Sequence, residues 1–133
     1  MKRLSRGQIL VIEDEPIIAA DISRIVELAG HIVIGVGRTR DEAVTLGKST
    51  QPDLILADIQ LADGSSGIDA VQDLLLEFGG IPVIFITAFP ERLLTGNRPE
   101  PAFLISKPYN DSHVTSAVSQ AMFFATTTML TKP

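Results

Sequence analysis

The sequence predicts an α/β fold in which a doubly wound, five-stranded parallel sheet of order 2-1-3-4-5 lies between layers of helices. Short apolar runs alternate along the chain with longer segments whose apolar residues recur every three or four positions. A length of 133 residues with 45% hydrophobic residues suits one domain with an aliphatic core, since aromatic residues are only 5% and tryptophan is absent. Right-handed crossovers between parallel strands place helices on both faces of such a sheet.

Five continuous apolar runs suit strands that are buried on both faces of a parallel sheet. The first run, QILVI, stops abruptly at Glu13, and the third run, LILA, stops at Asp58. The fourth run, PVIFI, is followed directly by Thr87. The expected strands cover residues 8–12, 31–36, 54–57, 82–86 and 102–105.

Helical segments are indicated by apolar periodicity and by residues typical of helix ends. Pro16 fits the first position of a helix in which Ile18, Ile22 and Ile25 share one face, and Gly30 ends that helix. A short second helix is capped by Thr39, a third carries Ile68, Val71, Leu75 and Phe78, and a last one begins near Asn110 or Asp111.

The segment between Thr87 and Ala102 departs from this regular pattern, because it contains three prolines and a glycine. A proline inside a helix costs about 3 kcal/mol or more, so a full-length fourth helix is implausible there. We expect one short turn around residues 91–95, followed by an extended connection.

Domain organisation is predicted to be simple, with a single domain over residues 1–133. Its core covers about residues 8–124, and residues 1–7 and 125–133 are expected to form flexible ends.

Composition and charge exclude several classes of function. A net charge of −5 is poorly suited to a phosphate backbone, so we expect no direct nucleic-acid binding. The absence of cysteine excludes disulfides, thiolate metal sites and cysteine nucleophiles. The apolar run at residues 9–12 is too short for a signal peptide or a membrane span, so we expect a cytoplasmic protein without membrane attachment.

Polar side chains follow the expected strands at their carboxyl ends, where open α/β sheets bind ligands. Glu13, Asp14 and Asp58 bring three carboxylates to this edge, and Thr87 and Lys107 add a hydroxyl and an ammonium group. Three converging carboxylates repel one another unless a cation enters, and an oxygen-only set favours Mg²⁺. Because lysine and threonine bind phosphoryl oxygens well, the set predicts phosphoryl transfer to an aspartate.

These residues, in this order on the expected strands, resemble the receiver domain of two-component response regulators. The resemblance covers about residues 8–124 and includes the Lys107-Pro108 pair. It implies a flavodoxin-like fold with a cis peptide bond between Lys107 and Pro108. It also implies a phosphoaccepting signalling domain rather than an enzyme, with a histidine kinase as phosphodonor.

The resemblance also assigns roles to individual residues of the site. Asp58 becomes the phosphoacceptor, and Mg²⁺ is bound by Asp14, Asp58 and the Gln60 backbone carbonyl, with Glu13 acting mainly through water. Thr87, Lys107 and the backbone amide of Ala88 become the phosphoryl-binding groups.

The run FITAFPER at residues 85–92 is similar to a subclass, the PhyR-type receivers of general-stress regulators. In such regulators a sigma-factor-like domain precedes the receiver, and phosphorylation frees that domain to sequester an anti-sigma factor. The resemblance therefore implies a sigma-like domain or an anti-sigma factor as a partner.

Leu104 departs from the usual receiver pattern, in which Tyr or Phe stands three residues before the lysine. The neighbouring Phe103 is expected to point to the other face of the sheet. We therefore expect the conformational change on phosphorylation to pass through residues 89–101. The candidate switch and partner surface comprises Phe89, Leu93, Leu94 and Leu104.

Three other functions share parts of this pattern. A phosphatase of the haloacid-dehalogenase type needs a second aspartate where this chain has Gln60. A flavin mononucleotide module needs a phosphate loop where this chain has Glu13 and Asp14, which repel phosphate. A pseudo-receiver, which binds partners without being phosphorylated, remains the alternative because of Leu104.

Overall fold

The computed structural model describes residues 6–94 and 101–131, and their fold is the predicted α/β sandwich. Five parallel strands form one sheet of order β2-β1-β3-β4-β5, which confirms the predicted topology. The strands are β1 (Gln8–Ile12), β2 (Ile32–Gly37), β3 (Leu54–Ala57), β4 (Val83–Thr87) and β5 (Phe103–Ser106). Two strands match their predicted bounds and the other three begin and end one residue later.

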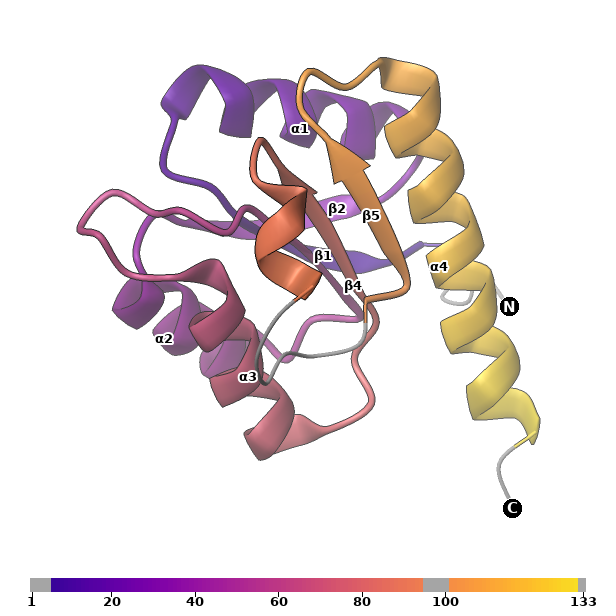
Figure 1. Ribbon diagram of the computed structural model, residues 1–133. Coiled ribbons are helices and arrows are strands. Elements are labelled where there is room, and N and C mark those ends of the chain that lie inside the picture. Colours follow the sequence, from indigo (N-terminus) through magenta and orange to yellow (C-terminus); the bar gives the residue numbers. More distant parts are fainter. Residues whose placement is uncertain (1–5, 95–100, 132–133) are drawn as a thin grey trace.

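Helices cover both faces of the sheet, with α1 and α4 on one face and α2 and α3 on the other (Figure 1). Two of them begin at side-chain caps, since Thr39 accepts a hydrogen bond from the Glu42 amide and Ser66 accepts one from the Ile68 amide. The helices are α1 (Pro16–Leu28), α2 (Arg40–Thr50), α3 (Gly67–Phe78), α4 (Asp111–Thr131) and the short 3₁₀ helix η2 (Pro90–Leu94).

The hydrophobic core lies in two layers, because successive side chains of a strand point to opposite faces. On β1, Ile9 and Val11 pack toward α1 and α4, whereas Leu10 and Ile12 pack toward α2 and α3. All four side chains are fully buried, so this strand lies at the centre of the fold.

In its described residues, the proline-rich connection after β4 contains one short helical turn, as predicted. η2 ends at Leu94, and the expected continuation at residues 95–100 lies outside the described residues. No other helix in the described part of the chain covers β5 on the side of α2 and α3 (Figure 1). Leu104 is consequently 41% exposed although it lies on a strand of the sheet.

The two ends of the core differ from their predicted positions. Gly7 was assigned to a flexible end, but it is buried and its amide donates to His31 Nδ1 at 2.8 Å. The last helix was expected to end near residue 124, but α4 continues to Thr131. No proline or glycine occurs between residues 111 and 131, and a threonine run lowers helix propensity only slightly.

Within the described residues, no helix combines the length and the apolar character that crossing a bilayer requires.

Candidate functional site

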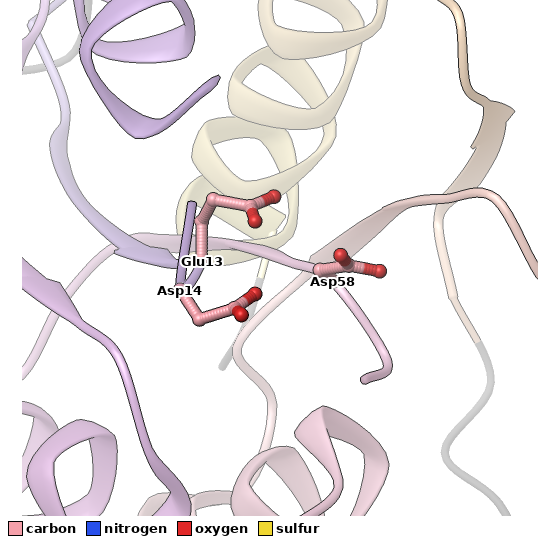
Figure 2. A group of neighbouring side chains, drawn as sticks. All are labelled: Glu13, Asp14 and Asp58. Carbon is pink, nitrogen blue, oxygen red and sulfur yellow. The ribbon is translucent and has the colours of Figure 1, made fainter. Parts of the chain in front are cut away.

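The carboxyl ends of four neighbouring strands bring the predicted site residues to one edge of the sheet. Glu13 and Asp14 follow β1, Asp58 follows β3, Thr87 ends β4, and Lys107 follows the last residue of β5. One carboxylate oxygen from each of the three acidic residues lies within 4.8 Å of the other two. Figure 2 shows Glu13 and Asp14 on one turn of the chain, with Asp58 on the neighbouring strand end.

Lys107 connects the two sides of this acidic cluster. Its ammonium group donates to Glu13 Oε1 at 2.9 Å and to Asp58 Oδ2 at 2.8 Å. Burial alone would lower the pKa of Lys107, but the hydrogen bonds to Asp58 and Glu13 outweigh burial and raise it above its ordinary value. Lys107 is therefore a charged group near neutral pH, and it faces the predicted phosphoacceptor.

Glu13 is the most buried member of the cluster, with 1% of its surface exposed. Burial raises its pKa, and this effect is only partly offset by the hydrogen bonds from Lys107 and from the Glu15 amide. Three carboxylates with one ammonium leave an excess of negative charge that Lys107 alone does not neutralise. The donor set contains only oxygen atoms, so the residues present fit a hard cation such as Mg²⁺.

Asp58 is held rigidly by its backbone. Its amide donates to the Ile12 carbonyl of β1 at 2.9 Å, and its Oδ1 accepts from the Ile59 amide at 2.6 Å. The second carboxylate oxygen, Oδ2, is bonded to Lys107. The chain therefore presents this second oxygen to the Lys107 ammonium at the strand edge.

Gly67 is a site residue that the analysis of the sequence missed. A Cβ atom at this position would lie 1.7 Å from the backbone oxygen of Asp58, which no side chain tolerates. The Gly67 amide also donates to the Ile59 carbonyl at 2.7 Å, so the start of α3 lies directly against the loop that follows Asp58. The glycine after two serines was a visible signal, but only the close approach explains it.

Gln60 is exposed and lies in the same loop, two residues after Asp58. An isolated antiparallel bridge joins it to Ser66 and closes the loop before α3. The bridge fixes the Gln60 backbone within the loop that follows Asp58, and the part of Gln60 in binding a metal stays a prediction.

Thr87 is fully buried at the end of β4, and its Oγ1 accepts a hydrogen bond from the Phe89 amide at 3.0 Å. Its backbone carbonyl accepts from the Lys107 amide at 2.8 Å, which ties the ends of β4 and β5 together. Ala88 is exposed directly beyond it. The peptide bond between Lys107 and Pro108 is cis, as predicted.

The predicted switch and partner surface is brought together only in part. Leu104 is exposed, while Phe103 packs on the other face against the core of α1 and α4, as expected. Phe89 is half-buried, with the Arg92 guanidinium 4.6 Å from the centre of its ring. The prediction that Leu93 belongs to the exposed partner surface is wrong. Its side chain on η2 points inward, is 3% exposed and packs in the core beside α2 and α3. The Leu94 side chain lies outside the described residues.

Comparisons with known proteins agree with this geometry. The chain matches the family described as response regulator receiver domain over residues 9–119. It is 64% identical over 118 residues to the phyllosphere-induced regulator PhyR of Methylorubrum extorquens. That match covers 88% of this chain and 44% of the relative, so the chain spans less than half of that protein's length.

Solved structures show the same likeness in three dimensions. The receiver (REC) domain of PhyR from Erythrobacter litoralis is 52% identical with a TM-score of 0.85, covering 91% of this chain and 93% of that one. PhyR of Bartonella quintana in complex with the anti-sigma factor NepR is 61% identical with a TM-score of 0.59, covering 90% of this chain and 49% of that one. With the family match over most of its length and the strand order observed, the chain belongs to the response regulator receiver family and, within it, to the PhyR-type receivers.

Proposed function

We propose that this protein is a phosphoaccepting switch in which Asp58 takes a phosphoryl group from a histidine kinase. The observation that carries the proposal is the position of the Asp58 carboxylate. It lies within 4.8 Å of two further carboxylates and 2.8 Å from the Lys107 ammonium. A nucleophilic oxygen, a place for a metal ion and a fixed positive charge are the groups that phosphoryl transfer to an aspartate requires.

In the proposed reaction, an oxygen of Asp58 forms a bond to phosphorus while the bond from phosphorus to the kinase histidine nitrogen breaks. The imidazole leaves with the electron pair of that bond, and an acyl phosphate remains on Asp58. Asp14, Asp58, Glu13 and the Gln60 carbonyl would hold Mg²⁺, which neutralises charge on the phosphoryl oxygens when it is bound.

Three groups of the chain would contact the phosphoryl group once it is bound to Asp58. The Lys107 ammonium now shared by Glu13 and Asp58 can turn to a phosphoryl oxygen, which is a stronger partner for a point charge. The Thr87 hydroxyl accepts from the Phe89 amide and can still donate its own proton to a second phosphoryl oxygen. The Ala88 amide would provide a third contact.

A protein is the proposed donor because an apolar side chain stands exposed beside the site. Ile17 occupies the second position of α1, three residues after Asp14, and is 84% exposed. Such a side chain adds nothing to the binding of a small phosphodonor, but it suits contact with a kinase. Because these kinases transfer phosphoryl groups inside the cell, we propose a cytoplasmic location.

General-stress signalling through an anti-sigma factor is the proposed output. Its support is the likeness to PhyR, which in Bartonella quintana forms a complex with the anti-sigma factor NepR. A groove between β5 and α4, lined by residues that include Leu104, Ile105 and Ala117, lies open beside the site. Because the chain spans less than half of the Methylorubrum relative, a sigma-like domain or an anti-sigma factor is a proposed partner rather than an observed one.

Intact mass tests the central proposal. The parent chain, Asp58→Asn and the control Asp63→Asn are incubated with acetyl phosphate, with Mg²⁺ or with EDTA. We expect one phosphoryl adduct on the parent and on the control, and none on Asp58→Asn or without Mg²⁺. Asp63 is a suitable control, because it is an exposed aspartate in the same loop.

The same experiment distinguishes the proposed function from the pseudo-receiver alternative, which Leu104 favours. A folded parent chain that takes no phosphoryl group from acetyl phosphate or from a phosphorylated histidine kinase would contradict the proposed function. Calorimetric titration with Mg²⁺ would then report whether the acidic cluster still binds the metal.

A further inference from the structure

A chain of four polar side chains joins α1 to the connection between β5 and α4. The Tyr109 hydroxyl donates to Asp21 Oδ2 at 2.7 Å, and Arg24 donates to Asp21 Oδ1 through Nε at 3.2 Å and Nη2 at 2.7 Å. Arg24 Nη2 also donates to Asp111 Oδ2 at 3.0 Å. We call these four residues, Asp21, Arg24, Tyr109 and Asp111, the α1–α4 clamp.

Tyr109 and Asp21, two residues of the clamp, lie near the proposed phosphorylation site in sequence. Tyr109 follows Lys107 by two residues, directly after the cis peptide bond to Pro108. Asp21 lies in the second turn of α1, the helix that begins two residues after Asp14. The clamp therefore joins the segment that carries the lysine to the helix that follows the acidic pair.

The position of Lys107 depends on such a link because β5 is an edge strand. Within the described sheet β5 pairs with β4 alone, and the Lys107 amide donates to the Thr87 carbonyl on that side. On its outer side the segment after β5 has no neighbouring strand. The Tyr109 ring, which packs against the core of α1 and α4, and its hydroxyl bond to Asp21 supply the missing support.

The clamp is poorly placed to serve mainly as a stabilising ion pair. The side chains of Asp21, Arg24 and Asp111 are 37%, 49% and 61% exposed, and exposed ion pairs add little to stability. Tyr109 is half-buried, and burial together with its bond to Asp21 raises its pKa, so the hydroxyl remains a donor. What the contacts do is fix the direction in which the chain leaves Pro108.

We propose that Tyr109 and Asp21 are positioning residues that hold Lys107 against the Asp58 carboxylate. The inference rests on the proposed function, since the position of Lys107 matters for the rate only if Asp58 accepts a phosphoryl group. Neither residue touches the reacting atoms. Their effect passes through the two peptide bonds between Tyr109 and Lys107.

The test is a double-mutant cycle on the rate of adduct formation from acetyl phosphate with Mg²⁺, followed by intact mass. We expect Tyr109→Phe and Asp21→Ala each to slow the reaction about tenfold, because a misplaced contact group costs up to about a hundredfold in rate. The double variant is expected to be no slower than Asp21→Ala, since that substitution already removes the hydrogen bond from the Tyr109 hydroxyl. Asp21→Asn keeps an acceptor for the Tyr109 hydroxyl and is expected to restore a rate close to that of the parent.

A matched control comes from the other face of the sheet, where Arg40 on α2 donates to Asp73 on α3 at 2.8 Å. This ion pair has similar exposure and lies between two helices, so Asp73→Ala is expected to leave the rate unchanged. The proposal would be overturned if Tyr109→Phe formed the adduct at the rate of the parent. It would also be overturned if the rate reductions of the two single variants multiplied in the double variant, because the two residues would then act independently.

The position of Lys107 also has a readout that needs no phosphoryl transfer. Its ammonium group is bonded to two carboxylates and its side chain is 15% exposed, so a ¹H–¹⁵N signal from slowly exchanging protons is expected in the parent. In Tyr109→Phe we expect this Lys107 signal to be lost while the unfolding temperature stays that of the parent. If the signal were retained, the proposed positioning role of the α1–α4 clamp would be contradicted. Absence of an adduct on the parent would contradict the proposed function instead, so the two failures are distinguishable.

Discussion

The centre of the sheet and its β5 edge are built differently, although both contribute to one site. At the centre, β1 and β3 have strand neighbours on both sides and helices on both faces, and their core side chains are 0–1% exposed. At the edge, β5 has one strand neighbour and alternates between half-buried and exposed residues, with the short η2 in place of a full helix. The central strands position the proposed phosphoacceptor Asp58 and the acidic residues Glu13 and Asp14, and the edge carries Lys107 and the open surface.

This difference indicates a division of tasks. A phosphoryl-accepting carboxylate needs a fixed position, which close-packed backbone provides at Asp58. A surface that would change on phosphorylation needs few constraining contacts, and Leu104 on β5, which is 41% exposed, meets this condition. Substitutions at the centre should therefore cost stability, whereas those at the edge should leave the fold intact.

The largest effect is expected from Gly67→Ala at the centre. The new Cβ would overlap the Asp58 backbone oxygen, so the strand end must shift and the loss should reach about 4 kcal/mol, or folding should fail. Urea unfolding measures it, with Gly64→Ala as the control. Gly64 has a positive φ of 81° but nothing within 4 Å of a Cβ, so only about 1 kcal/mol of strain is expected there. Equal losses would show that the close approach is not a constraint.

A pair of identical substitutions compares the core with the edge directly. Leu93→Ala empties a position that is 3% exposed and should cost about 3 kcal/mol, as deletions in cores do. Leu104→Ala changes a side chain that is 41% exposed and should cost about 1 kcal/mol or less. Unfolding midpoints in urea measure both, and a larger loss at Leu104 would refute the proposed contrast.

The smallest effect concerns β2, the other edge of the sheet, and depends on pH. Burial lowers the pKa of His31 below its usual 6.5, and its Nδ1 accepts from the Gly7 amide. The folded state thus favours the neutral imidazole of His31. The stability that depends on this neutral form is complete above pH 6.5, the pKa of an unfolded histidine. It is lost as the pH falls through the pKa of His31 in the folded state, which is lower. We expect the parent to lose stability relative to His31→Asn between about pH 7.5 and about pH 5, because protonation of the buried imidazole costs more in the folded than in the unfolded state.

His113 provides the control for this titration, because it is exposed on α4. His113→Asn should keep the pH dependence of the parent when unfolding in urea is repeated at several pH values. An unchanged dependence in His31→Asn would show that the Gly7 contact does not require the neutral imidazole.

Most of the fold followed from patterns that are local in sequence. The uninterrupted apolar runs predicted strands buried on both faces, and the prolines after Thr87 predicted the short fourth helix. The site followed as well, because the carboxyl ends of parallel strands meet at one edge, which brings Asp14, Asp58 and Lys107 together. Strand order and site composition were thus determined by the sequence itself.

What the sequence alone left undecided depends on contacts between distant segments. Tyr109 and Asp21 are 88 residues apart, and no local pattern relates a tyrosine after a proline to an aspartate inside the first helix. The inward turn of Leu93 and the contact of Gly67 with the Asp58 backbone depend on how η2 and α3 pack on the sheet. Spacing along the chain determines which face of an element is apolar, but only packing decides which atoms come within contact distance.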